Sequence, residues 1–355
     1  MTHTLVVRLD SAGDVLLAGP AVRAVAAGSD RVTMLVGPLG AAAARLLPGV
    51  DEVLEWHCPW ISSDPAPVRA DDIARLVQSL SERAIDRAVV LTSFHQSPLP
   101  TALVLRTAGI SWLGAISEDY PGSLLDLRHH VDPMLPEAER ALSLATAAGY
   151  SLAATDRGLL GLRQPLPDVS HLTTASRPVV LHPGTSVPAR AWPAARHAEV
   201  AEALALRGYD VLVTGSPAEK DLTATVCGST GAIDLGGRTS LAELAAVLAR
   251  AAVLVVGNTG PAHLGAAVGT PVVSLFAPTV PARRWAPYGV PLALLGDQAA
   301  VCRDTRATTC PVPGHPCLAS VTAADVVAAI EGLVGRAAEP TRAAGTALAS
   351  VEARG

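Results

Sequence analysis

The sequence predicts an α/β protein with two Rossmann-like domains, each built on a parallel β-sheet, that face a central cleft. Its 355 residues suit two domains, because a typical domain has about 150 residues. Short apolar runs alternate along the chain with runs of helical periodicity, which is typical of βαβ units and parallel sheets. The alternation lapses once, over residues 151–177, where glycine, proline and aspartate gather as in a linker.

In the first half of the chain, β-rich runs are separated by helical patterns. Residues 71–84 show the clearest helix, with apolar side chains at 73, 76, 77, 80 and 84, a spacing that buries one face. Pro136 suits the first turn of a later helix, and Gly149 suits its end. The predicted strands are 5–9, 32–36, 52–56 and 88–91, and the predicted helices are 13–27, one ending near 47, 71–84, 102–108 and 136–149.

The second half repeats this alternation after the linker. The predicted strands are 178–181, 210–213, 233–235, 253–256 and 272–276, and the predicted helices are 193–207, 218–227, 241–251, 261–268 and 323–334. We therefore expect an N-terminal domain over 1–168, a C-terminal domain over 169–336 and a flexible tail over 337–355.

Composition excludes several classes of protein. Hydrophobic residues make up 50% of the chain, but the longest apolar stretch, 251–256, falls far short of the roughly 20 residues of a membrane span. A net charge of −5 argues against nucleic-acid binding through a basic face. The first residues resemble no secretory signal, and five cysteines in a chain of this length do not indicate a disulfide scaffold. We expect a cytoplasmic protein, with peripheral membrane contact left open.

The loop after the first strand contains the first candidate catalytic group. It reads Arg8-Leu-Asp10-Ser11-Ala-Gly13-Asp14, which matches neither a dinucleotide fingerprint nor a Walker loop. Asp14 would stand at a helix N-terminus, where an acid is favoured by the helix dipole. Alternatively, its carboxylate serves as a general base in the cleft. Asp10 is a second acid within reach, and Gly13 allows a tight turn.

Two loops of the second half suit a phosphate or diphosphate. The segment from His182 to Pro193 offers backbone amides and hydroxyls at Thr185 and Ser186, and a guanidinium at Arg190. A capped turn before the next helix is the structural alternative, and His182 is expected to be a buried histidine.

Two further loops follow later strands. Asn258, Thr259, Gly260 and His263 surround a turn into a helix whose free amides form an anion site. Glu219 could accept hydrogen bonds from ribose hydroxyls or could be a helix N-terminal acid.

Cys302, Cys310 and Cys317 share a proline-rich segment with His315. Four soft ligands in one segment could hold zinc, but the spacing matches no common zinc class. We expect reduced, partly buried cysteines and no metal or other cofactor.

Taken together, these loops resemble those of the family 9 glycosyltransferases, the ADP-heptose:lipopolysaccharide heptosyltransferase group. The opening Arg-x4-Gly-Asp runs from Arg8 to Asp14, and His-Pro-Gly-x-Ser with a basic residue before Trp-Pro runs from His182 to Pro193. The Thr-Gly-x-Pro-x-Glu segment ends at Glu219. The block from Leu235 to Thr279 contains Thr-Gly-Pro-x-His-Leu and Gly-Thr-Pro. The resemblance spans about residues 4–335.

The resemblance implies a GT-B fold and an inverting glycosyltransferase that needs no catalytic metal. The aspartate of Gly-Asp, here Asp14, would be the general base. The basic residue before Trp-Pro, here Arg190, would contact the diphosphate, and Thr259, Gly260 and His263 would surround the diphosphate and donor sugar. The implied donor is a nucleotide sugar, with ADP-heptose favoured.

Several points stay open at this stage. Many relatives carry aspartate where this chain has Asn258, so the donor sugar is in question. Lysine in many relatives corresponds to Arg190 here, in a chain whose only lysine is Lys220. The acceptor, a glycan, a glycolipid or a small natural product, would bind near residues 93–98 and 118–125. Alternatives are a nucleotide-sugar epimerase of similar architecture and a non-catalytic sugar-nucleotide-binding module.

Overall fold

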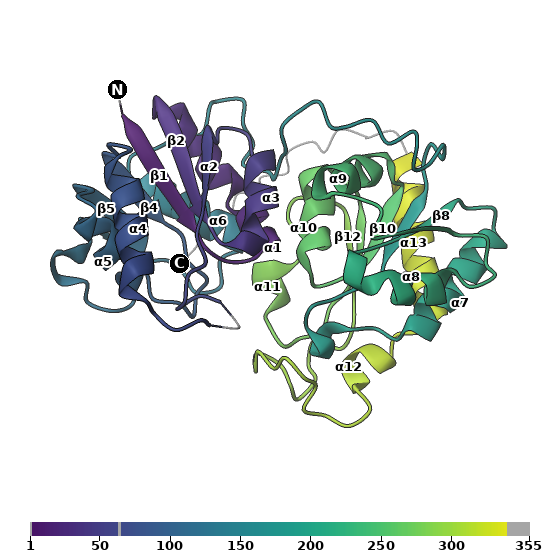
Figure 1. The fold of residues 1–355 in the computed structure, drawn as a ribbon. Helices are drawn as coiled ribbons and strands as arrows, with labels where there is room; N and C mark the ends of the chain where they lie inside the picture. Colours follow the sequence, from purple (N-terminus) through teal and green to yellow (C-terminus); the bar gives the residue numbers. More distant parts are fainter. Residues whose placement is uncertain (1, 63–64, 339–355) are drawn as a thin grey trace, which may run out of the picture.

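The computed structural model describes residues 2–62 and 65–338 and contains two six-stranded sheets (Figure 1). The first sheet has the strand order β3-β2-β1-β4-β5-β6, and all its pairings are parallel. Its strands are β1 (His3–Arg8), β2 (Arg31–Val36), β3 (Glu52–Glu55), β4 (Arg87–Val90), β5 (Trp112–Ile116) and β6 (Leu127–His129).

The second sheet has the order β12-β11-β10-β7-β8-β9 and is also parallel throughout. Its strands are β7 (Val179–His182), β8 (Val211–Gly215), β9 (Ile233–Gly236), β10 (Val253–Gly257), β11 (Val272–Leu275) and β12 (Leu292–Leu295). Read from β9 to β12, this is the arrangement of the first sheet, the Rossmann order. The predicted pair of parallel-sheet domains is thus confirmed.

Helices cover both faces of each sheet and divide the interior into three apolar cores. The central strands β1 and β10 are buried along their whole length, which explains their continuous apolar sequences. Helices α4 (Ala70–Ser81) and α5 (Leu99–Thr107) pack on the outer face of the first sheet. Helices α7 (Ala194–Ala205), α8 (Lys220–Cys227) and α13 (Ala323–Ala338) pack on the outer face of the second.

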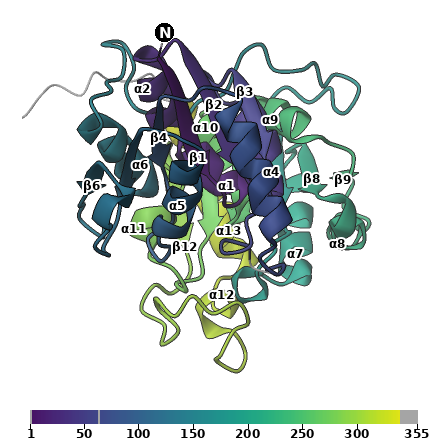
Figure 2. The same ribbon diagram turned by 60° about the vertical axis from the view of Figure 1, so that its left-hand side comes forward.

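The third core lies between the two sheets and takes side chains from both halves of the chain. Figures 1 and 2 show its helices between the sheets, where α1 lies against α10. The helices of this core are α1 (Ala12–Leu17), α2 (Gly19–Ala27), α3 (Pro38–Leu46), α6 (Glu137–Ala147), α9 (Leu241–Arg250) and α10 (Gly260–Ala267). A shared core holds the loops of the two sheets at fixed positions relative to each other.

A buried ion pair also joins the two halves. Arg284 in the short helix α11 (Ala282–Trp285) lies 2.7 Å from Glu137 at the start of α6, and both side chains are almost completely buried. Nearby, Tyr288 donates a hydrogen bond of 3.2 Å to Glu139. These contacts hold α11 and the residues that follow it, in the second half of the chain, against α6 of the first half.

The secondary structure differs from the prediction at several points. The predicted helix 13–27 is two helices, α1 and α2, which are separated by a single turn residue, Ala18. Strands β5, β6 and β12 were not predicted; they are short, and Gly114 interrupts the apolar pattern of β5. Residues 151–177 contain neither helix nor strand. We propose the domain boundary within this segment, between residues 168 and 169. Of the predicted tail, residues 339–355 lie outside the described residues.

Across the described part of the chain, no helix is both long enough and apolar enough to cross a membrane.

Candidate active site

The candidate site is a cavity of about 470 Å³ between the two domains, referred to below as the interdomain cavity. Four loops contribute most of its lining, and they follow β1, β4, β7 and β10. In each sheet these are the two central strands, where the direction of strand succession reverses. Parallel sheets bind ligands at the carboxyl ends of such strands because the two following loops diverge there. Here both sheets direct that position at the same space.

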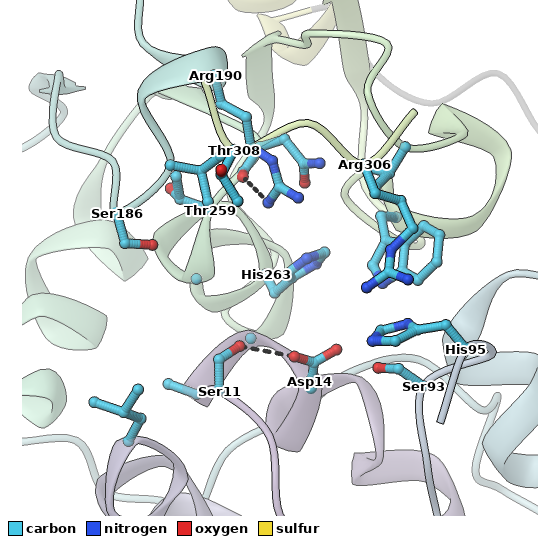
Figure 3. Close-up of a pocket in the computed structure, with 18 of the residues that line it drawn as sticks. Ser11, Asp14, Ser93, His95, Ser186, Arg190, Thr259, His263, Arg306 and Thr308 are labelled. Carbon is cyan, nitrogen blue, oxygen red and sulfur yellow. Dashed lines mark hydrogen bonds between the residues drawn. The ribbon is translucent and has the colours of Figure 1, made fainter. Parts of the chain in front are cut away.

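Asp14 stands in the first turn of α1 and lines the interdomain cavity. Arg8 Nη2 lies 2.9 Å from Asp14 Oδ1, and Ser11 Oγ donates a hydrogen bond of 2.8 Å to Asp14 Oδ2 (Figure 3). Burial opposes ionisation of this carboxyl, but Arg8, the Ser11 hydroxyl and His263 outweigh it and lower the pKa of Asp14. Asp14 is therefore an oriented carboxylate at neutral pH.

Asp10 shares the same arginine but has a different environment. Arg8 Nε lies 2.9 Å from Asp10 Oδ2, and Gln96 Nε2 donates a hydrogen bond of 2.5 Å to Asp10 Oδ1. Burial dominates and raises the pKa of Asp10 despite the arginine. Asp10 does not line the interdomain cavity, so the two predicted acids occupy different places.

The N-terminus of α10 packs against the start of α1, and both line the interdomain cavity. Thr259 precedes the helix without capping it through its side chain, so the first amides of α10 are not covered by that hydroxyl. Thr259 Oγ1 is buried and has no hydrogen-bond partner within residues 2–62 and 65–338. Pro261 has no N–H, and the Ala262 N–H donates a hydrogen bond of 3.1 Å to Thr259 O. Gly260 therefore supplies the amide that opens the helix. This amide and the unpaired hydroxyl suit a negatively charged ligand.

His263 and Arg190 flank this helix terminus. Burial, opposed by Asp14, lowers the pKa of His263 to about 4, so its ring is neutral at pH 7. Arg190 Nη1 donates a hydrogen bond of 3.2 Å to the main-chain oxygen of Asn258, and this fixes the guanidinium beside the helix (Figure 3). Its Nε is buried and has no partner in the described chain. Arg190 thus keeps donors for a ligand.

The structure brings nine predicted residues together in the interdomain cavity and leaves three outside it. Those inside are Ser11, Gly13, Asp14, Ser186, Arg190, Asn258, Thr259, Gly260 and His263. Asp10 lines a neighbouring cavity, and Thr185 and Glu219 line a separate one of about 410 Å³. Glu219 accepts a hydrogen bond of 2.7 Å from the amide of Ser216 in a capping box. This is the helix-terminal role that the sequence left open, and His182 is buried as expected, hydrogen-bonded to Thr214.

Several lining residues were not predicted as part of the site. Ser93 and His95 follow β4, in a loop that the sequence assigned only to the acceptor. Burial and the charge of Arg306 lower the pKa of His95 to about 4. Arg306 has a left-handed backbone with a φ of 56°, held by a hydrogen bond of 2.8 Å from its amide to Thr279 O. A non-glycine residue rarely adopts this conformation, so nearby packing must enforce it.

The three cysteines and His315 of the proline-rich segment do not line the interdomain cavity, although Arg306 and Thr308 of the same segment do. Cys302 and Cys317 are buried in the outer core of the second domain, and burial raises the pKa of Cys317 to about 11. His315 Nε2 contacts the main-chain oxygen of Ala189 at 3.0 Å. Within the described residues, no three His, Cys, Asp or Glu side chains form a group suited to a metal ion.

Comparisons with known proteins find one matching family model and several solved structures of similar fold. Residues 73–314 match the family model of glycosyltransferase family 9 (heptosyltransferase). A family 9 glycosyl transferase from Veillonella parvula matches with a TM-score of 0.79 and 18% identity, over 94% of this chain and 98% of that chain. The E. coli ADP-heptose LPS heptosyltransferase II matches with a TM-score of 0.70 and 20% identity, over 95% and 99%. E. coli heptosyltransferase WaaC with ADP gives 0.67 and 20%, over 95% and 99%.

A comparison with curated protein sequences finds no match. The two facing Rossmann domains with a cavity between their central strands have the GT-B architecture of these structures, and together with the family model they identify a glycosyltransferase. The family model covers more than half of the sequence, and the chain belongs to glycosyltransferase family 9 (heptosyltransferase).

Proposed function

We propose that the protein transfers a heptose from ADP-heptose to an acceptor hydroxyl, with inversion at the anomeric carbon and Asp14 as the general base. One observation carries the proposal. Asp14, an oriented carboxylate, lines the same cavity as Arg190 and the N-terminus of α10. A base and an anion site on opposite walls suit a transfer between two bound molecules.

The reaction is a single displacement in this account. The acceptor oxygen forms a bond to the anomeric carbon while its proton passes to Asp14. The bond from that carbon to the diphosphate oxygen breaks, and its electron pair leaves with the nucleoside diphosphate. Arg8 and Ser11 each engage one oxygen of Asp14, and each carboxylate oxygen keeps a further lone pair for the acceptor proton.

Charge on the departing diphosphate is stabilised by groups that are already in place. Arg190 is fixed beside α10 by its hydrogen bond to Asn258, and Gly260 at the helix terminus lines the same cavity. Preorganised donors of this kind lower the barrier because they need no rearrangement as charge develops. Ser186 lies in the lining on the same side and can add a hydroxyl donor.

The proposed donor follows from relatives, and Asn258 makes it a specific question for this chain. A solved structure of E. coli heptosyltransferase WaaC contains ADP-2-deoxy-2-fluoro heptose. In this chain Asn258 is buried and lines the interdomain cavity, and its neutral side chain adds no charge to that cavity. Because Asn258 leaves the identity of the sugar in question, the nucleotide and the sugar of the donor are tested in separate experiments.

The test is calorimetric binding of ADP, GDP and UDP, followed by turnover of ADP-heptose with NMR assignment of the product anomer. We expect ADP to bind most tightly and the product to have the opposite anomeric configuration from the donor. No binding of ADP, or a product with retained configuration, contradicts the proposal. Arg196→Gln on the outer helix α7 provides a control, because Arg196 forms an exposed ion pair with Glu199 at 2.9 Å and does not line the interdomain cavity.

A further inference from the structure

A second cavity, of about 730 Å³, lies in the N-terminal domain beside the interdomain cavity and is called here the N-terminal cavity. The two cavities share Ser11, Asp14, Leu39, Ser93 and His95 in their linings. A molecule in the N-terminal cavity can therefore present a hydroxyl to Asp14 while the donor occupies the other side. Its volume is large enough for a sugar or a comparable ring system.

Among the described residues, the titratable side chains that line the N-terminal cavity, apart from the Cys58 thiol, are two carboxyl groups and the two histidines His57 and His95. Among the described residues that line it there is no lysine or arginine, and its carboxyl groups belong to Asp10 and Asp14. Arg8 lies between these two acids and is only 3% exposed, so it neutralises them from behind without facing the cavity. His95 adds no charge at pH 7, since burial and Arg306 lower its pKa to about 4.

The remaining wall has a large apolar component. Leu39, in the first turn of α3, is 78% exposed although it is a leucine, and it stands where the two cavities meet. Leu9, Pro38 and Ile61 extend the same apolar wall. An apolar surface with no lysine or arginine beside it gives phosphate and carboxylate groups no counter-charge and favours an uncharged ligand with an apolar face.

Cations do occur elsewhere near the domain interface, but they do not border this cavity. Arg140 and Arg284 line a third cavity of about 400 Å³ that excludes Asp14. Both face Glu137, at 3.7 Å and 2.7 Å. Arg190 and Arg306 line the interdomain cavity only. No described cation is therefore placed to hold an acidic acceptor against Asp14 from within the N-terminal cavity.

We infer that the acceptor is an uncharged alcohol with an apolar face, whose entering part carries neither phosphate nor carboxylate. This inference rests on the proposed function, because it takes Asp14 as the group that receives the acceptor proton. It narrows the acceptor to the uncharged members of the glycan, glycolipid or natural-product classes.

Two matched probes test the acceptor class by binding, without turnover. Hexyl β-glucoside and hexyl β-glucuronide differ by one carboxylate, and each is titrated into the full-length protein saturated with ADP. We expect the glucoside to bind and the glucuronide to bind at least about tenfold more weakly, because its carboxylate would lose hydration without gaining a lysine or arginine partner. Equal or tighter binding of the glucuronide overturns the inference.

Ala66→Arg locates the binding, because Ala66 is exposed and lines the N-terminal cavity. The variant should reverse the preference toward the glucuronide. Leu103→Arg is the control, since Leu103 is 56% exposed on the outer helix α5 and lines none of the four cavities described. An unchanged preference in Ala66→Arg, or the same reversal in Leu103→Arg, overturns the inference. If the unmodified protein binds ADP but neither probe, the inferred acceptor class is wrong and the proposed function stands. If the unmodified protein does not bind ADP, the proposed function is wrong.

Discussion

Gly13 at the start of α1 packs directly against His263 in α10. A Cβ atom on Gly13 would lie 2.9 Å from His263 Cδ2 and 3.3 Å from Gly260 Cα. Real Cβ atoms almost never come as close as the first distance, so only glycine permits this approach of the two domains. The contact sets the separation between Asp14, one residue later, and the N-terminus of α10.

Gly13→Ala should therefore move the two walls of the interdomain cavity apart. We expect kcat to fall by up to about 10²-fold, since small misplacements of reacting groups have effects of that size. Gly19→Ala is the matched control. A Cβ there meets Leu47 at 3.5 Å, an ordinary contact, and kcat should stay unchanged. Equal kcat values for the two variants would show that the close approach has no role in transfer.

Arg190 should determine affinity for the nucleoside diphosphate. Replacing it by glutamine removes a charged donor, and a hydrogen bond to a charged group contributes about 1.5–3 kcal/mol. We expect Arg190→Gln to raise the Kd of ADP by roughly tenfold to a hundredfold. Arg190→Lys should give an intermediate value, because it keeps the charge and loses the planar fork. A calorimetric Kd equal to that of the unmodified protein would leave Arg190 with a structural role only.

The ion pair between Arg284 and Glu137 should contribute to stability across the domain interface. Glu137→Gln leaves a buried guanidinium without its anion, and such a change costs about 3–5 kcal/mol. The exposed pair of Arg196 and Glu199 supplies the comparison, and Glu199→Gln should change the unfolding free energy by less than about 1 kcal/mol. Urea unfolding of both variants measures the difference. Similar values for the two would mean that the buried pair does not hold the domains together.

Buried histidines should make the fold less stable in acid. Burial lowers the pKa of His182 and His263 to about 4 and that of His197 to about 3, from an ordinary value of 6.5. Between these values the unfolded chain binds more protons than the folded one. Stability is thus complete above about pH 6.5 and is lost as the pH falls toward the folded values.

His197→Phe isolates one of these contributions. His197 contacts Trp192 edge to face with ring centroids 4.8 Å apart, and its Nδ1 is buried without a partner in the described residues, so phenylalanine can replace it. Each such histidine adds about 1.4 kcal/mol of stability per pH unit in this window. Urea midpoints measured from pH 4.5 to 7 should therefore depend less on pH in the variant. An unchanged slope would contradict the assignment.

Short-range sequence patterns were enough to predict the site residues that come directly after apolar strands. Asp14 and Thr259 stand at helix N-termini after apolar strands, and such positions are recognisable because strand, turn and helix signals adjoin in the sequence. The parallel sheets were predictable for the same reason. The break at Ala18 was not, since both α1 and α2 have helical sequences and tertiary packing decides where the chain turns.

Contacts between distant segments were beyond the reach of the sequence. Arg306 lies beside His95 across the domain interface. Two hydrogen bonds hold the segment that contains Arg306: the Arg306 amide donates to Thr279 O, and the Ala189 amide donates to Thr308 O. No local pattern around residue 306 indicates these partners. Glu219 shows that one residue can fit two patterns, since it forms a capping box with Ser216 and also lines a cavity, so its predicted role in binding the donor stays a prediction.

The most direct measurement of the central claim compares kcat and the Kd of ADP in Asp14→Asn and Asp10→Asn. General bases contribute about 10²–10⁴-fold, so Asp14→Asn should lose that factor in kcat while ADP still binds. Asp10→Asn should lose far less, because Asp10 lines only the N-terminal cavity and receives no proton in the proposed reaction. A kcat for Asp14→Asn close to that of the unmodified enzyme, or a larger loss in Asp10→Asn, would contradict the assignment of Asp14 as the base.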